Sequence, residues 1–234
     1  MSDAPPPAQF DEAGLLYSRQ FDDHYFSRID GRAECAHVFI DGNDLPLRWR
    51  QQSEQTDTHG QNFAIGELGF GTGLNFLETW RQWRDIRQPG QHLSFLSVEG
   101  FPLAAETAGQ ALKNWPELGA LSARLLERWD QLTSPMQLDD QTRLQVLQGD
   151  VTDMVVQFPL VDAWYLDGFS PANNPEMWGG DLLRSVFERS VVGGTFASYT
   201  AAGWVRRNLE SAGFMVEKRT GFGSKRHMIA GRRL

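Results

Sequence analysis

The stretch Glu67–Asn75, with the sequence ELGFGTGLN, decides the fold. An apolar run at 63–68 leads into it, and a helical pattern at 74–84 follows, with aromatic side chains recurring on one helical face. Glycines at such a junction allow the backbone to turn tightly and a ligand to approach the helix start closely. The stretch therefore predicts a ligand-binding turn between a strand and a helix.

The spacing of the glycines distinguishes between cofactors. Gly69, Gly71 and Gly73 give G-x-G-x-G, whereas the dinucleotide fingerprint G-x-G-x-x-G would need a glycine at Leu74. Glu67 precedes the first glycine, and its carboxylate would repel a pyrophosphate. An acidic start instead suits the sulfonium and ammonium groups of S-adenosylmethionine, so we expect that cofactor and not a dinucleotide.

The remainder of the chain alternates between apolar strands and helical patterns, which predicts a parallel sheet covered by helices on both faces. Two late strands joined by a glycine-rich connection at 220–224 predict an antiparallel hairpin at one sheet edge. Together these features indicate an α/β, Rossmann-like class I methyltransferase fold with a mostly parallel seven-stranded sheet. Strands are expected at 63–68, 93–98, 144–147, 161–166, 194–199, 214–218 and 227–230, and helices at 74–84, 102–129 (broken near Pro116), 151–157, 175–190 and 202–211.

The residues before this core predict a small β extension. Apolar residues at 38–40 and 45–49 flank the turn sequence Asp41–Gly42–Asn43, a pattern typical of a β-hairpin. The polar stretch 51–61 predicts a loop, and the proline-containing leader 1–9 lacks the features of a signal peptide. We therefore expect an extension at 1–61 packed on a methyltransferase domain at 62–234.

Acidic residues follow four successive predicted strands: Glu67, Glu99, Asp150 and Asp167. Ligands of open α/β sheets bind beyond the carboxyl ends of the strands. Taken singly, each acid is a candidate helix cap or surface charge; as a group they favour a site, in which Glu99 accepts from the ribose hydroxyls and Asp150 from the adenine amino group. The expected cofactor-binding residues are Glu67, Gly69, Gly71, Gly73, Asn75, Glu99, Asp150 and Asp167.

The loop Asp167–Pro175, DGFSPANNP, is stiffened by two prolines beside the expected methyl donor. It is analogous to the D-P-P-Y loop with which amino-group methyltransferases hold a nitrogen in line with the methyl. Carboxyl and alkylammonium pKa values differ by several units in solution, so an aspartate is a poor base for such an amine. We therefore assign Asp167 as the catalytic residue that orients an amine hydrogen.

Four stretches, Ser18–Ser27, Glu67–Phe76, Asp167–Trp178 and Gly221–Met228, carry a resemblance to a known family. The chain resembles the methyltransferase half of the bifunctional tRNA 5-methylaminomethyl-2-thiouridine biosynthesis proteins, the MnmC family. The resemblance implies a tRNA partner and methylation of 5-aminomethyl-2-thiouridine at the wobble position of the anticodon loop. The usual partner half is a flavin-dependent oxidoreductase that removes a carboxymethyl group, and it is absent from this chain.

Five residues are expected to bind the substrate: Tyr25, Phe169, Trp178, Lys225 and Arg226. The segment around Tyr25 is either a lid over the cofactor or an aromatic anchor that packs the leader on the core. Trp178 either stacks on the target base or fills a helix face. Lys225 and Arg226 follow a glycine-rich turn, and we expect them near the RNA phosphates.

Charge and composition constrain the remaining function classes. The net charge is −8, yet the eight basic and two acidic residues of 206–234 give that segment +6 and leave −14 for the rest, which favours RNA approaching one face. A single cysteine, no clustered metal ligands and no apolar run of about 18 residues favour a metal-free cytoplasmic protein with no membrane contact. An aminopropyltransferase and a non-catalytic tRNA-binding module remain as alternatives.

Overall fold

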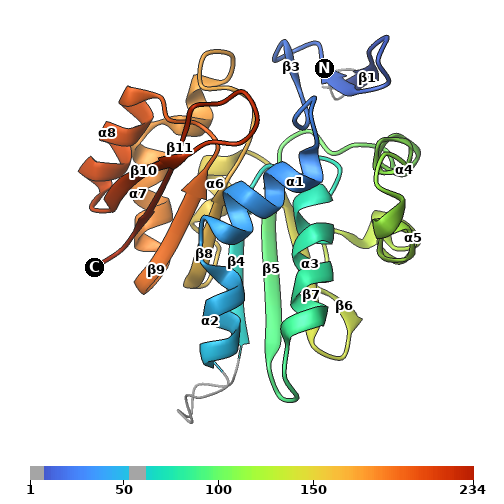
Figure 1. The fold of residues 1–234 in the computed structure, drawn as a ribbon, viewed down its shortest axis with the longest axis horizontal. Coiled ribbons are helices and arrows are strands. Elements are labelled where there is room, and N and C mark those ends of the chain that lie inside the picture. The colour runs from blue at the N-terminus through green and yellow to red at the C-terminus, as the bar shows by residue number, and fades with distance from the viewer. Residues whose placement is uncertain (1–7, 53–61) are drawn as a thin grey trace.

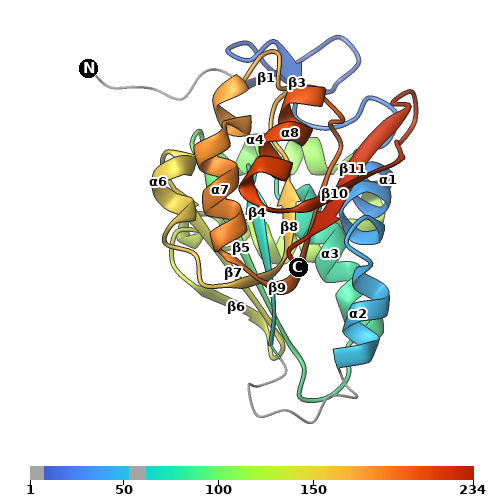
Figure 2. The ribbon, with the colours of Figure 1, turned by 90° about the vertical axis from the view of Figure 1, so that its left-hand side faces the viewer.

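The structure, a computed structural model that describes residues 8–52 and 62–234, has three layers (Figures 1 and 2). An eight-stranded sheet lies between two layers of helices, with the strand order β10-β11-β9-β8-β4-β5-β7-β6. Most of the leader and residues 53–61 of the predicted loop lie outside the described ranges, while residues 51 and 52 belong to a helix. The α/β fold expected from the sequence is confirmed.

Five parallel strands form the centre of the sheet: β4 (Asn62–Leu68), β5 (His92–Glu99), β7 (Thr142–Gln148), β8 (Val161–Leu166) and β9 (Ser190–Ser198). β4 pairs in parallel with both β5 and β8, so the strand order reverses on either side of it. The carboxyl ends of these strands meet at the upper edge of the sheet in Figure 1. A reversal of strand order at that edge creates the crevice where α/β sheets bind ligands.

Both outer edges of the sheet are antiparallel. β10 (Met215–Thr220) and β11 (His227–Arg232) form the expected hairpin, and β11 pairs antiparallel with β9. β6 (Met136–Asp139) adds an eighth strand, antiparallel to β7, that the sequence analysis did not predict. This strand is short and its pairing with β7 is irregular, so its alternating pattern is too brief to stand out.

Helices cover each face of the sheet. One face carries α3 (Leu74–Ile86) with the two N-terminal helices, and the other carries α6 (Val151–Val155), α7 (Gly180–Glu188) and α8 (Gly203–Ala212) (Figure 2). Beside α3, α4 (Ala105–Leu112) and α5 (Gly119–Leu126) are separated by a short 3-10 turn at Pro116–Leu118, as expected from the proline. Among the helices of the described ranges, none is long and apolar enough to cross a membrane.

The predicted hairpin at 38–49 is wrong, because this segment is helical. α1 (Gly31–Cys35) continues through a π-helix at Ala36–Asp41 and is followed by α2 (Leu45–Gln52). Asp30 starts the run: its Oδ1 accepts from the backbone N–H groups of the second and third residues after it, at 3.0 and 3.1 Å. Residues 38–40 are buried in the main hydrophobic core, so tertiary burial overrides their β propensity.

β structure does occur in the extension, but earlier in the chain. β1 (Ala8–Phe10), β2 (Leu16–Ser18) and β3 (Asp23–His24) form a small antiparallel sheet. This sheet lies above the carboxyl edge of the main sheet (Figure 1). The N-terminal segment therefore reaches the region where the expected site residues lie.

Candidate active site

A cavity of about 1010 Å³ opens at the carboxyl ends of β4, β5, β7 and β8. The rest of its wall comes from residues 20–39, the loop after Asp167 with the start of α7, Tyr199 and the β10–β11 connection. Its charged side chains are mostly acidic, which favours cationic ligands. The carboxylates that line it are Asp23, Glu34, Glu99, Asp150, Asp167, Glu176 and Asp181, against the cations Arg28 and Lys225.

The glycine loop combines ligand-facing and structural positions. Gly69, Gly71 and Gly73 have φ values of 87°, 54° and 77°, a region that strongly favours glycine. Gly69 and Gly71 line the cavity, whereas Gly73 does not. A Cβ on Gly73 would lie 3.0 Å from both Leu125 and Phe70, so its role is to let the loop pack on the core.

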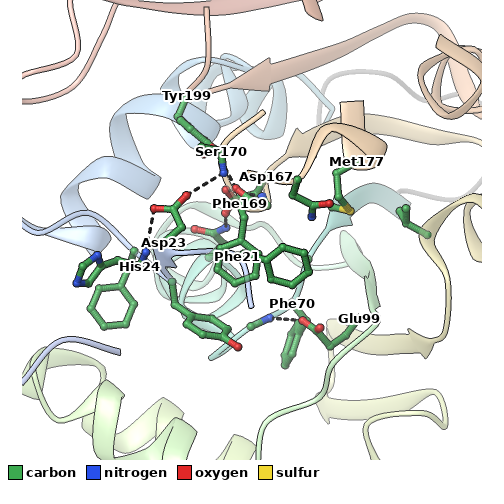
Figure 3. Close-up of a pocket in the computed structure, with 18 of the residues that line it drawn as sticks. Phe21, Asp23, His24, Phe70, Glu99, Asp167, Phe169, Ser170, Met177 and Tyr199 are labelled. Carbon is green, nitrogen blue, oxygen red and sulfur yellow. Dashed lines mark hydrogen bonds between the residues drawn. The ribbon is translucent and has the colours of Figure 1, made fainter. Parts of the chain in front are cut away.

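Glu99 and Asp150 both face the cavity while also holding backbone. The Oε2 atom of Glu99 accepts from the Gly71 N–H at 2.8 Å, and its Oε1 atom accepts from the Phe101 N–H at 2.7 Å (Figure 3). Asp150 caps α6 by accepting from the Thr152 N–H at 2.8 Å. Because a carboxylate oxygen has two lone-pair sites, these contacts leave acceptor capacity for a ligand.

Glu67 lies beneath the glycine loop and does not line the cavity, which corrects the expectation of direct ligand contact. Its side chain is buried between neighbouring strands, with 1% of the residue exposed. Oε2 accepts from the Ser97 hydroxyl at 2.7 Å, while Oε1 has no hydrogen-bond partner among the described residues. Burial raises the pKa of Glu67 well above its ordinary value, which favours the neutral form of this carboxyl group.

Asp167 follows β8 directly and lies at the centre of the cavity wall. Its Oδ2 atom accepts from the Asn75 side-chain amide at 2.7 Å, and its Oδ1 atom from the Gly168 N–H at 2.9 Å. Burial nevertheless raises the pKa of Asp167 to about 7, although both hydrogen bonds favour the ionised form. The carboxyl group can therefore exchange a proton near neutral pH, which solution pKa values do not predict.

The N-terminal segment is attached to the loop that carries Asp167. Phe21 stacks on Phe169 with 4.6 Å between ring centroids, and Asp23 Oδ2 accepts from the Ser170 N–H at 2.8 Å (Figure 3). The edge of the Tyr25 ring meets Phe169 at 5.2 Å, and Tyr25 lines the cavity. These contacts show the aromatic anchor, and the same rings line the cavity; the role of the segment as a lid stays a prediction.

The sequence analysis missed Phe21 and Asp23 as site residues. Both fall within the Ser18–Ser27 stretch that carried the resemblance, so a signal was present. Nothing in the local pattern indicates that their partners lie near residue 170. Burial raises the pKa of the neighbouring Tyr25 hydroxyl, which keeps it a neutral hydrogen-bonding group.

Trp178 does not stack on a base in this structure, because it is fully buried and outside the cavity. Its Nε1 donates to the Phe169 carbonyl at 3.1 Å, and its ring meets Tyr199 edge-on at 6.0 Å. The second of the two expected roles, filling a helix face, is therefore the observed one. Met177, its neighbour, lines the cavity instead (Figure 3).

Lys225 and Arg226 differ in their surroundings. Lys225 lines the cavity, with its Nζ atom 2.8 Å from Glu34 Oε1 and 4.0 Å from the centroid of the Tyr199 ring. Arg226 is exposed and does not line the cavity. Lys225 is therefore paired within the fold whereas Arg226 does not line the cavity, and contact of either residue with RNA phosphates stays a prediction.

Several basic residues of the C-terminal segment have partners within the fold. Arg206 pairs with Glu210, and Arg219 pairs with Glu217 and Asp44. Arg233 donates to two backbone carbonyls, those of residues 187 and 190.

A family model described as S-adenosyl-L-methionine-dependent methyltransferase matches residues 116–233, which include β7, β8, the Asp167 loop and the C-terminal hairpin. The chain belongs to this family. The methyltransferase is thus an enzyme whose methyl donor is S-adenosyl-L-methionine, and the aminopropyltransferase and non-catalytic alternatives are set aside. The predominantly acidic lining of the cavity agrees with this cationic cofactor.

Relatives of the methyltransferase carry a common name. It is 46% identical over 222 residues (93% of this chain) to the tRNA 5-methylaminomethyl-2-thiouridine biosynthesis bifunctional protein MnmC of Nitrosospira multiformis. It is 40% identical over 97% of its length to the protein of that name from Pseudomonas fluorescens. In both comparisons the chain spans 35% of the relative's own length.

A solved structure supports the fold. The crystal structure of MNMC2 from Aquifex aeolicus superimposes on 99% of this chain, and on 71% of that one, with a TM-score of 0.75 and 23% sequence identity. At this level of identity the likeness concerns the fold only.

Proposed function

We propose that the methyltransferase transfers a methyl group to a primary amine on tRNA, namely the aminomethyl nitrogen of 5-aminomethyl-2-thiouridine at the wobble position. The observation that carries the proposal is the position of Asp167, a carboxyl group at the end of β8 that lines the cavity and is held by Asn75 and the Gly168 N–H. The relatives' printed name supplies the nucleoside and the tRNA.

The cofactor is assigned to the part of the cavity next to the glycine loop. There Glu99 accepts from the ribose hydroxyls with its remaining lone pairs, and Asp150 accepts from the adenine amino group. The backbone of Gly69 and Gly71 approaches the amino-acid portion, with Glu67 and its unpaired oxygen below. When bound, S-adenosyl-L-methionine supplies a methyl group activated by its sulfonium. Asn75 also lines this part of the cavity, and its side-chain amide orients Asp167.

Asp167 acts on the acceptor nitrogen. Its carboxylate accepts an N–H hydrogen bond from the neutral amine and so aims the nitrogen lone pair at the methyl carbon. Such positioning can supply much of the rate of a displacement reaction. With its pKa near 7, Asp167 can also take the proton that the nitrogen loses once the new N–C bond has formed.

Two aromatic residues complete the proposed acceptor site. The Phe169 ring packs against the rings of Phe21 and Tyr25 at the cavity. We assign Phe169 and Tyr25 to contacts with the uracil ring. Arg226 is assigned to the phosphate backbone of the anticodon loop. A flavin-dependent oxidoreductase that removes a carboxymethyl group is the proposed source of the amine.

The test is mass spectrometry of nucleosides from tRNA bearing the aminomethyl group, after incubation with the protein and a cofactor labelled with deuterium in its methyl group. The expected product is 5-methylaminomethyl-2-thiouridine that carries the label. An Asp167→Ala variant should lower the rate of methyl transfer more than it lowers cofactor affinity, since alignment matters most in the transition state. Labelled product at another nucleoside, or at none, would refute the proposal.

A further inference from the structure

One corner of the cavity already holds an alkylammonium group, supplied by the chain itself. The Lys225 Nζ atom lies 2.8 Å from Glu34 Oε1 and 4.0 Å above the Tyr199 ring. A carboxylate combined with an aromatic face is a favourable environment for a cation. All three residues line the cavity, and the Glu34 side chain is only 13% exposed.

This corner is joined to the proposed catalytic loop. The Tyr199 hydroxyl donates to the Gly168 carbonyl at 2.8 Å, so the ring is fixed to the residue that follows Asp167 (Figure 3). The ring is also supported from behind by Trp178. Its exposed face and the Glu34 carboxylate are therefore held in place near Asp167, whichever cation occupies them.

Lys225 is the movable member of the group. It lies in the connection between β10 and β11, and its side chain is 42% exposed. A lysine carries its charge on a flexible four-carbon stem, so it can leave one partner for another at little cost. Glu34, by contrast, belongs to helix α1, which is packed against α3.

We propose that Glu34 and the face of Tyr199 form an ammonium-binding subsite for the acceptor arm, which Lys225 fills until the acceptor enters and displaces it. The inference rests on the proposed function, because it takes the aminomethyl group as acceptor. That arm, like lysine, is an alkylammonium at neutral pH. The subsite recognises the charged arm on entry. The arm then gives one proton to solvent water in the open cavity, and the neutral amine moves to Asp167 before methyl transfer. Nothing but the acceptor's own ammonium is needed to displace Lys225.

The test compares two anticodon stem–loop RNAs, one with 5-aminomethyl-2-thiouridine and one with 2-thiouridine at the wobble position. Their dissociation constants are measured in the presence of S-adenosylhomocysteine, so that no methyl transfer occurs. The dissociation constant of the 2-thiouridine RNA divided by that of the aminomethyl RNA reports recognition of the arm, because the phosphate contacts are common to both RNAs and cancel. The wild-type protein should favour the aminomethyl RNA.

Glu34→Gln should lower this ratio about tenfold or more, as expected for loss of one charge-assisted hydrogen bond. Lys225→Met, which keeps most of the stem but removes the competing cation, should raise the ratio several-fold. Tyr199→Leu should lower the ratio more than Tyr199→Phe, since phenylalanine loses only the hydroxyl bond to Gly168 and keeps the aromatic face. Lys218→Met is the matched control, because Lys218 is exposed on β10 away from the cavity, and its ratio should equal that of the wild type.

A Glu34→Gln protein that binds S-adenosylhomocysteine normally and keeps the wild-type ratio would overturn the subsite. A Lys225→Met protein with a much lower ratio than the wild type would also overturn the subsite, since Lys225 would then be needed to recognise the arm. If the wild type methylates the aminomethyl RNA yet shows no preference for it, only this inference fails. If the wild type yields no methylated nucleoside, the proposed function itself fails.

Discussion

The side-chain amide of Asn75 donates to Asp167 Oδ2 at 2.7 Å and so links the first turn of α3 to the end of β8. Asn75 belongs to the glycine stretch and Asp167 begins the loop proposed to hold the acceptor. One hydrogen bond thus connects the cofactor side of the cavity to its acceptor side. Because the donor stabilises the ionised carboxylate, it also influences the pH at which Asp167 becomes active.

Replacing Asn75 with leucine, which is similar in size but has no donor, should move the pH–rate profile toward alkaline pH. The wild-type rate of methyl transfer should rise through pH of about 7 as Asp167 ionises. Loss of a hydrogen bond to a charged group, worth about 1.5–3 kcal/mol, raises the pKa by about one to two units. Single-turnover rates across pH measure the shift, and superimposable profiles would remove Asn75 from this role.

The difference in the free energy of unfolding between cofactor-free Asp167→Asn and wild-type protein should favour the variant more at pH 8 than at pH 5. The native pKa of about 7 exceeds the ordinary value of 3.8, so between these values the native state keeps a proton that the unfolded chain has lost. Wild-type stability therefore falls as pH rises through this window, by at most about 1.4 kcal/mol per pH unit. Urea unfolding of both proteins at several pH values tests this, and a constant difference would contradict it.

Glu99→Ala should weaken cofactor binding by about 1.5–3 kcal/mol for each ribose hydrogen bond lost. The variant also releases the backbone N–H groups of Gly71 and Phe101, so the glycine loop loses its anchor. Glu99→Gln is the matched variant, because its single side-chain oxygen still accepts and it should bind with intermediate affinity. Isothermal titration gives the three affinities; a folded alanine variant with wild-type affinity would exclude Glu99 from the site.

Trp178→Phe should lower the free energy of unfolding by about 1–3 kcal/mol, because the Phe169 carbonyl loses its indole donor. The effect should appear as lower stability and as slower methyl transfer through a loosened Asp167 loop. RNA affinity should change little, since Trp178 does not reach the cavity. A variant with unchanged stability and much weaker RNA binding would restore the base-stacking role.

Arg226→Ala should reduce the slope of log affinity against log salt by about 0.7, the value for one phosphate contact to single-stranded nucleic acid. Lys225→Met should leave the slope unchanged for RNA without the aminomethyl arm, because Lys225 then remains paired with Glu34. Affinities at several salt concentrations decide both points. A slope reduced by Lys225→Met and not by Arg226→Ala would reverse the two assignments.

The elements that the sequence predicts well depend on local patterns. The run before Gly69 and the helical spacing after Gly73 indicate a strand and a helix without knowledge of any partner. The alternation that continues to residue 211 determines the parallel core, and the two late strands without a helix between them indicate the hairpin. The glycine spacing also distinguishes a methyltransferase from a dinucleotide-binding enzyme, because each glycine is needed for the backbone conformation at its own position.

Burial by distant partners is what local patterns leave open. Residues 38–40 have strand-like composition, yet they are helical because packing against the sheet and α3 buries them. Trp178 is as compatible with a base as with a core, and only its contacts with Phe169 and Tyr199 decide the matter. The sequence brought the glycine loop and the acids to one edge of the sheet, since parallel strands end together.

The tertiary structure alone decided what closes that edge. Asp23 meets Ser170 across 147 positions of the chain, and Lys225 meets Glu34 across 191. The sequence separation of such residues does not predict their contact, because the packing of all the intervening elements determines how close they lie in space. The methyl donor could therefore be predicted from the sequence. The residues that form the walls of the proposed acceptor site could be identified only from the tertiary structure.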